Sequence, residues 1–473
     1  TGLGEQALEA NTTGSSNTGV GHAALHANTT ASNNTGVGFY AMLANTTGTQ
    51  NTAVGNQSLD ANTSGNYNVA VGYNALTTQT TADRNTAIGQ SALKLTTTGT
   101  NNTAVGQAAL NDNTTGEDNT AVGSGALDAS TTASNNTAVG KHSLGANTTG
   151  HSNVAVGANT LQTNVGGQEN VAIGRNSLYS NLNASYNIAI GPDAMYSVTG
   201  TAGNNIAIGR NSLYTNTSGV QNVVVGTQAA DATASINYIT VVGHGALGTY
   251  NDTGDRYITA IGYNAMASAT TGSRSTAVGA FACRHATIGD NAALGYSALE
   301  NATSATDCSA VGSFALHNLT TGSYNTAVGR EALGATTTAT HNTAVGKTAL
   351  AANTTGTQNN AFGSNSLVVA TTANYNNAFG YATLGATTTG SSNVAIGHVA
   401  LAANTTGDYN HAMGRNALND NTTGSYNIAI GGAALQKCVT ASNNTAIGYL
   451  ALDKTTDEDN VAVGNYALRE NTS

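Results

Sequence analysis

Residues 51–59 read NTAVGNQSL and residues 68–76 read NVAVGYNAL, and this pattern returns every 17 residues along most of the 473-residue chain. Each copy contains a small-apolar-Gly triplet, whose last residue (Gly55 and Gly72 in these two copies) is called the anchor glycine below. Between Gly4 and Gly464 we count 28 copies. A repeat of fixed length along a whole chain indicates a repeat architecture, in which each unit stacks on the next.

Two further positions of the repeat carry large apolar side chains. One stands directly before the anchor glycine and is usually Val or Ile, and the other stands four residues after it and is usually Leu. Their representatives are Val54, Val71 and Ile88 before the anchor glycine, and Leu59, Leu76 and Leu93 after it. Ala precedes the Val or Ile in most copies, and the rest of the unit is a polar stretch such as NTTG.

Asparagine occupies the position four residues before the anchor glycine in most copies, as at Asn51, Asn68 and Asn85. Stacked asparagines can hydrogen-bond amide to amide along a pile of strands, or they can cap turns. We interpret this column as a structural ladder; ligand binding by the asparagines is the alternative.

A unit of 17 residues is too short for a pair of helices. Val and Thr favour strands, whereas Gly, Asn and Ser mark turns. Stacking such units in register predicts an all-β parallel β-solenoid, or β-roll, of about 28 coils, which forms a single continuous domain over residues 1–473. Because side chains alternate across a strand, the Ala and Val columns should lie on opposite faces. We expect the Ala column to offer a surface for close approach, and three chains around one axis are the simplest assembly.

The composition excludes several classes of function. Only 8% of residues are charged, the net charge is −10, and 14 Lys and Arg are spread without a basic stripe, so nucleic acid is not an expected partner. The sequence contains no run of 18 apolar residues, so we do not expect a segment that inserts into a membrane. The three cysteines form no metal-binding pair, and the ten histidines are scattered. We therefore expect no enzyme activity, no cofactor and no metal site.

The strings NTAVGNQSL (51–59), NVAVGYNAL (68–76) and NIAIGGAAL (427–435) resemble the head repeats of trimeric autotransporter adhesins and related shaft repeats of bacteriophage tail fibres. The resemblance covers essentially the whole chain. It implies left-handed coils, a trimer, an extracellular position on a virion or cell surface, and a role in attachment. The 17-residue unit is longer than the family's usual unit, and Leu stands where small residues are common there.

The least regular interval runs over residues 231–311, where the spacing becomes 19 and 16 and charged residues gather. These charges are Asp252, Asp255, Arg256, Arg274, Arg284 and Asp290. Loops on a rigid scaffold often carry binding groups, but drift within a tolerant repeat produces the same irregularity.

Three tyrosines, Tyr179, Tyr196 and Tyr214, occupy the same position, five residues after the anchor glycine, in successive units, with Arg175 and Arg210 nearby in sequence. An exposed row of aromatic rings is a candidate contact for a cell-surface polysaccharide. Packing of the rings across coils is the alternative.

The sequence thus predicts a structural shaft or adhesin segment of a virus tail fibre or cell-surface appendage, acting as a stiff spacer. It opens and stops inside a repeat, so we expect a segment of a longer chain. Alternatives are a subunit of a self-assembling extracellular filament and a solenoid that binds ice or polysaccharide through Thr and Asn ladders.

Overall fold

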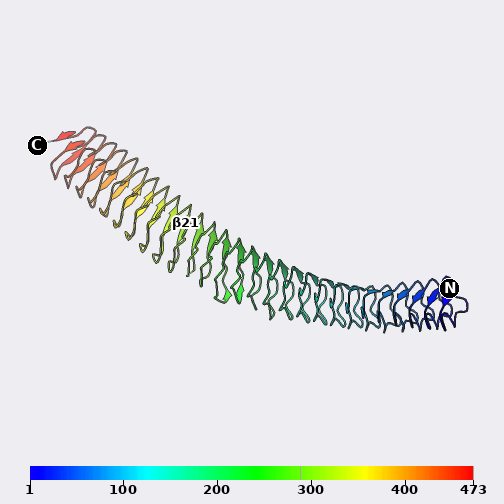
Figure 1. Cartoon of the computed structure of the whole chain (residues 1–473). Helices are drawn as coiled ribbons and strands as arrows, with labels where there is room; N and C mark the ends of the chain where they lie inside the picture. The colour runs from blue at the N-terminus through cyan, green and yellow to red at the C-terminus, as the bar shows by residue number, and fades with distance from the viewer. Residues whose placement is uncertain (288, 472–473) are drawn as a thin grey trace. The chain divides into compact units, whose positions relative to one another are not determined.

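The computed structural model describes residues 1–287 and 289–471, and over these residues it contains strands and turns but no helix. They form a parallel β-solenoid of 28 main strands, one short strand per coil (Figure 1). The solenoid, its repeat of about 17 residues and its all-β character confirm the predicted fold class. The chain divides into two compact units, Thr1–Ile239 and Thr240–Ser473.

The strands of the first unit are β1 (Gly2–Leu3), β2 (Thr18–Val20), β3 (Thr35–Val37), β4 (Thr52–Val54), β5 (Val69–Val71), β6 (Thr86–Ile88), β7 (Thr103–Val105), β8 (Thr120–Val122), β9 (Thr137–Val139), β10 (Val154–Val156), β11 (Val171–Ile173), β12 (Ile188–Ile190), β13 (Ile206–Ile208), β14 (Val223–Val225) and β15 (Ile236–Asn237).

The strands of the second unit are β16 (Thr240–Val242), β17 (Gly254–Asp255), β18 (Thr259–Ile261), β19 (Thr276–Val278), β20 (Ala292–Leu294), β21 (Ser309–Val311), β22 (Thr326–Val328), β23 (Thr343–Val345), β24 (Asn360–Phe362), β25 (Asn377–Phe379), β26 (Val394–Ile396), β27 (His411–Met413), β28 (Ile428–Ile430), β29 (Thr445–Ile447), β30 (Lys454–Thr455), β31 (Val461–Val463) and β32 (Glu470–Asn471).

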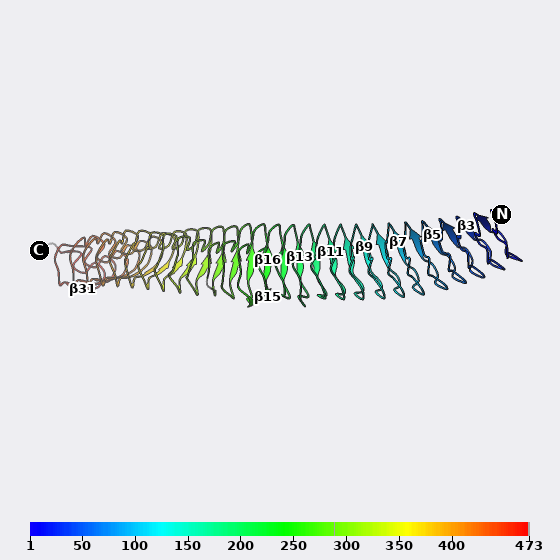
Figure 2. The same cartoon turned by 60° about the horizontal axis from the view of Figure 1, so that its bottom comes forward.

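Within each unit, successive strands pair in parallel and in register, so equivalent residues of neighbouring coils lie side by side (Figure 2). Between β4 and β5, for example, Ala53 lies opposite Ala70 and Val54 opposite Val71. Hydrogen bonds between coils continue beyond the strands: the Leu59 N–H donates to the Ala75 carbonyl at 2.9 Å. Each coil is therefore bonded to its neighbours at several points around its circumference.

The core of each coil is built from the small and the γ-branched apolar residues of the repeat. Ala53 on the strand and Leu59 after the anchor glycine are both fully buried. The other leucines of the column, Leu76 and Leu93, are buried in the same way. Because a three-residue strand spans little width, most coils place Ala beside Leu in the interior; Val241 and Leu247, both buried, are an exception.

The turn after the strand requires unusual backbone angles. The anchor glycine Gly72 has φ of +138°, and the following Asn74 and Leu76 have φ of +55° and +52°. The left-handed backbone conformation is energetically costly for residues with a Cβ. Here the backbone hydrogen bonds of Asn74 and Leu76 to the adjacent coils stabilise this conformation. This conformation turns the leucine inward.

Two columns of asparagine fill the polar part of the interior. In the first, the Asn68 side chain accepts a hydrogen bond from the Asn85 backbone N–H at 2.9 Å and donates to the Ala82 carbonyl at 3.0 Å. In the second, the Asn45 side chain donates to the side chain of Asn28 at 3.0 Å. Both columns are buried, so their amides satisfy backbone groups that the tight coil would otherwise leave unpaired.

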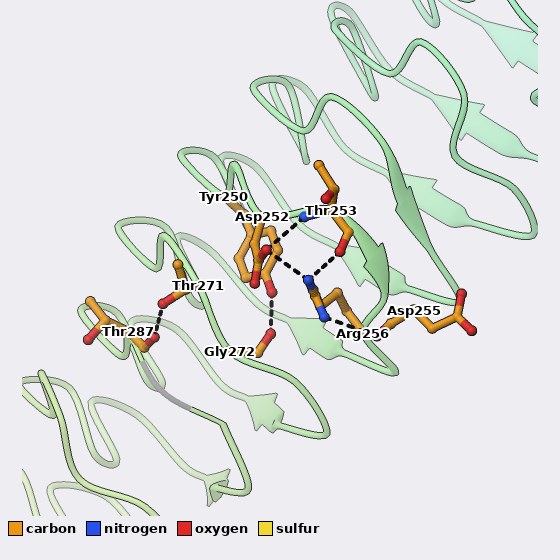
Figure 3. A network of polar contacts seen from close by, with 8 residues as sticks. All are labelled: Tyr250, Asp252, Thr253, Asp255, Arg256, Thr271, Gly272 and Thr287. Atoms are coloured by element: carbon orange, nitrogen blue, oxygen red, sulfur yellow. Dashed lines mark hydrogen bonds and ion pairs between the residues drawn. The ribbon is translucent and has the colours of Figure 1, made fainter.

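The irregular interval has a different interior. At the start of the second unit, Tyr250 is fully buried where most coils carry a small or polar residue, and its hydroxyl donates to the Gly272 carbonyl (Figure 3). Beside it, Asp252 and Arg256 form an ion pair of 2.7 Å. A second pair joins Arg274 to Asp290 at 2.6 Å. The charges gathered here are thus largely used within the fold.

Candidate functional site: an exposed apolar strand face

The strands turn their larger apolar side chains toward solvent. In β4, Ala53 is 0% exposed, whereas Val54, the next residue, is 37% exposed. Successive side chains of a strand point to opposite faces, so Ala53 and Val54 cannot both point inward. The narrow interior favours the smaller residue, Ala53, on the inner face. The expectation that the Ala column offers a surface for other chains was wrong: Ala lies in the core, and the column of Val and Ile forms the outer surface.

This outward column, which we call the strand face, extends through both units. Excluding Leu3 and Val463 in the first and last coils, its most exposed members have exposed fractions of 36 to 43%. They are Val54, Ile88, Val122, Val156, Ile173 and Ile208 in the first unit, and Ile261, Leu294, Val311, Val328, Phe379, Ile396, Met413, Ile430 and Ile447 in the second.

The size of the strand face exceeds what single chains usually expose. A strip one strand wide (about 10 Å) along some 14 coils spaced ~4.8 Å apart covers roughly 700 Å² in each unit. Isolated soluble proteins rarely expose more than a few hundred Å² of contiguous apolar surface. A partner in a standard interface buries about 800 Å². The strand face therefore has the size and character of a surface that another protein covers.

The structure brings Tyr179, Tyr196 and Tyr214 together as one stack. Their ring centroids are 5.0 and 5.2 Å apart, with interplanar angles of 1° and 16°. Face-to-face stacking covers both faces of Tyr196, and burial raises the pKa of its hydroxyl above the usual value.

The two arginines that the sequence places near this stack have different surroundings. Arg175 is bound to Asp193 at 3.2 Å in the neighbouring coil, whereas Arg210 is exposed. The structure thus places one ion pair beside a tyrosine stack that crosses three coils. Because Arg175 is paired with Asp193, its guanidinium is less available to bind a ligand.

The asparagines of the predicted ladder, Asn51, Asn68 and Asn85, are fully buried. Their side chains therefore lack access to a ligand in solution. Sequence reasoning missed the second buried column, which includes Asn28, Asn45 and Asn62. Its signal was present, because these residues also recur every 17 positions, but the polar NTTG context is equally typical of an exposed turn.

Over the described parts of the chain, no group of three or more His, Cys, Asp or Glu side chains is placed to hold a metal ion. A search of the same residues for a helix long and apolar enough to cross a membrane found none. Comparison of the sequence with protein-family models and with curated proteins found no match.

Proposed function

We propose that this chain is a non-enzymatic structural shaft segment of an extracellular fibre, such as a virus tail fibre or a cell-surface appendage, in which copies pack through the strand face. The observation that carries the proposal is the continuous exposed column of Val and Ile in each unit. Water contact along such a column is unfavourable by about 25 cal/mol per Å² of apolar surface, and association of copies removes it.

A spacer must resist bending, and the bonding between coils supports this role. Backbone hydrogen bonds join strand to strand, the buried asparagines join coil to coil, and threonine hydroxyls add a third set. The Thr46 hydroxyl, for instance, donates to the Thr63 carbonyl at 3.0 Å, and the Thr63 hydroxyl to the Thr80 carbonyl at 3.0 Å. Separating two neighbouring coils breaks all three sets at once.

A trimer is the assembly that we favour. A spacer that presents a part at one end needs copies running in the same direction, and this places the symmetry axis along the coils. Three chains around that axis can each turn the strand face inward. The resemblance to trimeric adhesin repeats supports the same number.

The test compares two sets of charged substitutions. Val54→Lys, Ile88→Lys and Val122→Lys together place charge on the strand face, whereas Thr47→Lys, Thr98→Lys and Thr115→Lys place the same charge on exposed turns. Sedimentation velocity should show an assembly for the natural chain and for the turn variant, and a monomer of 47.0 kDa for the strand-face variant. Monomeric natural chain at micromolar concentration would overturn the proposal.

A second candidate rests on a different column. An exposed threonine recurs at one position in most coils between residues 13 and 149, as at Thr30, Thr47, Thr98 and Thr115. A regular array of this kind can order water, and binding to ice is the function that it favours. A thermal hysteresis measurement tests this candidate: a freezing-point gap that Thr47→Lys and Thr98→Lys abolish supports it, and the absence of any gap removes it.

A further inference from the structure

A second row of aromatic rings, distinct from the tyrosine stack, crosses five successive coils of the second unit. Neighbouring ring centroids along it are 5.6, 5.3, 5.9 and 5.2 Å apart, and a histidine follows at 5.3 Å. Its members, which we call the aromatic row, are His244, Tyr263, Phe281, Tyr296, Phe314 and His317. All but His317 stand one or two residues after an anchor glycine.

At the start of the aromatic row, His244 and Tyr263 are stacked with an interplanar angle of 23°, whereas the following rings meet edge to face. From Tyr263 to Phe314 the interplanar angles are 88°, 88° and 77°. Tyr263 and Tyr296 are 51% and 48% exposed, whereas Phe281 and Phe314 are half-buried. The aromatic row therefore presents two exposed tyrosine rings to a ligand, whereas Tyr179, Tyr196 and Tyr214 in the parallel stack are half-buried.

Polar groups line the side of the aromatic row. Arg284 lies over the ring of Phe281, with its guanidinium carbon 5.3 Å from the centroid. Glu300 lies 3.7 Å from Arg284 and 3.6 Å from His317. Over the described residues, the buried Nε of Arg284 has no hydrogen-bond partner. The row thus has both donors and acceptors next to its apolar surface.

The aromatic row leads into a hollow of about 380 Å³. Its lining is Phe314, His317, Asn318, Glu331, Gly334 and Ala351. The hollow exists because Gly334 and Ala351 stand five residues after their anchor glycines, at the position that Tyr179 and Tyr196 occupy in other coils. One face of the hollow is aromatic, and the rest supplies an imidazole, an amide and a carboxylate.

We propose that the aromatic row and this hollow bind one strand of an extended, uncharged polysaccharide, which lies along the coils with one sugar ring in the hollow. The apolar C–H face of a sugar packs on an exposed aromatic face, and its hydroxyls both donate and accept hydrogen bonds. Rings spaced by successive coils suit a ligand that is itself a linear repeat. Arg284 and Glu300 form an ion pair of 3.7 Å, and these two side chains and His317 leave polar atoms for hydroxyl groups.

The test uses affinity electrophoresis in gels that contain a soluble β-1,4-glucan, a β-1,3-glucan or a mannan. At least one polymer should retard the natural chain. Tyr263→Ala with Tyr296→Ala should weaken the binding at least tenfold, and Ala351→Tyr, which fills the hollow, should weaken it also. The matched control, Tyr179→Ala with Tyr214→Ala, removes two rings of the covered stack and should leave the binding unchanged.

Three outcomes would overturn this inference: no retardation by any of the polymers, equal weakening by both tyrosine pairs, or full binding by Ala351→Tyr. Circular dichroism and sedimentation of each variant show whether fold and assembly are kept. The inference goes beyond the proposed shaft function, so loss of glycan binding with intact assembly would count against the inference alone.

Discussion

At the scale of single residues, the anchor glycine carries the most specific requirement of the repeat. Gly89 has φ of +134°, and a Cβ at this position would lie 2.5 Å from the Gly106 carbonyl oxygen of the next coil. A substitution is thus opposed by backbone strain and by a collision with backbone that cannot move independently.

We therefore expect Gly89→Ala to lower the free energy of unfolding by about 3 kcal/mol or more. The control is Gly145→Ala, because a Cβ there has its nearest neighbour at 3.3 Å, the His142 carbonyl oxygen, and no positive φ is involved. Denaturant titration followed by circular dichroism measures both. Equal losses would contradict the assigned role of the anchor glycine.

The buried asparagine column allows a prediction about the backbone amide of Asn85. Asn68→Ala removes the acceptor of the Asn85 N–H and the donor to Ala82, so we expect a loss of about 1–3 kcal/mol for each group left unpaired. Hydrogen exchange at the Asn85 amide should accelerate. Asn56→Ala, at an exposed position, should leave that exchange rate unchanged; acceleration in both variants would mean that the effect is not specific.

Buried cysteines make stability depend on pH. Burial raises the pKa of the Cys283 thiol to about 12 and that of Cys438 to about 11. An unfolded thiol releases its proton at a lower pH, so stability should be fully present below about pH 9 and fall as pH rises toward 12, by up to ~1.4 kcal/mol per unit for one thiol. Denaturant titrations at pH 8, 9.5 and 10.5 should show a smaller fall for Cys283→Leu, which restores the usual column residue. Parallel curves would contradict the prediction.

At the scale of the strand and turn, the sequence was sufficient for the strand positions but not for the direction in which they face. The Thr-Ala-Val alternation predicts two opposite faces, and β4 and β5 confirm the strands. It does not say which face is inside, because Val is the more apolar residue and Ala the smaller one. In the narrow coil, the smaller residue, Ala, occupies the inner face of the strand. The left-handed backbone of Leu76, with φ of +52°, also escaped prediction because it is uncommon for leucine.

The two faces of β5 give a paired prediction. Ala70→Asp places a carboxylate without a partner in the interior and should cost about 3 kcal/mol or more. Val71→Asp places the same carboxylate one residue later on the outer face and should keep the fold. Thermal unfolding followed by circular dichroism compares the two variants. The reverse order of stability would show that the Val column is the core.

The site was less predictable than the fold. Tyr179, Tyr196 and Tyr214 could be aligned because they share one repeat position, and the structure stacks them. The aromatic row escaped notice because its members occupy the first, second and fifth positions after the anchor glycine, and because two of them are histidines. Repeat columns reveal contacts within a column, whereas contacts between adjacent columns depend on the path of the turn.

At the scale of the whole molecule, the proposed function predicts that copies of the chain cover the strand face. A single nitroxide label measures this directly. The natural cysteines Cys283, Cys308 and Cys438 are buried, so they should react slowly at neutral pH, and the unsubstituted chain serves as the control for their labelling. Val122→Cys places the label on the strand face, and Thr115→Cys places it on an exposed turn.

If the copies pack around an axis along the coils, labels at position 122 converge and should show strong spin–spin broadening, which dilution with unlabelled chain removes. Labels at position 115 should give a narrow spectrum throughout. A narrow spectrum at position 122, unchanged by dilution with unlabelled chain, would contradict the claim that the strand face lies between copies.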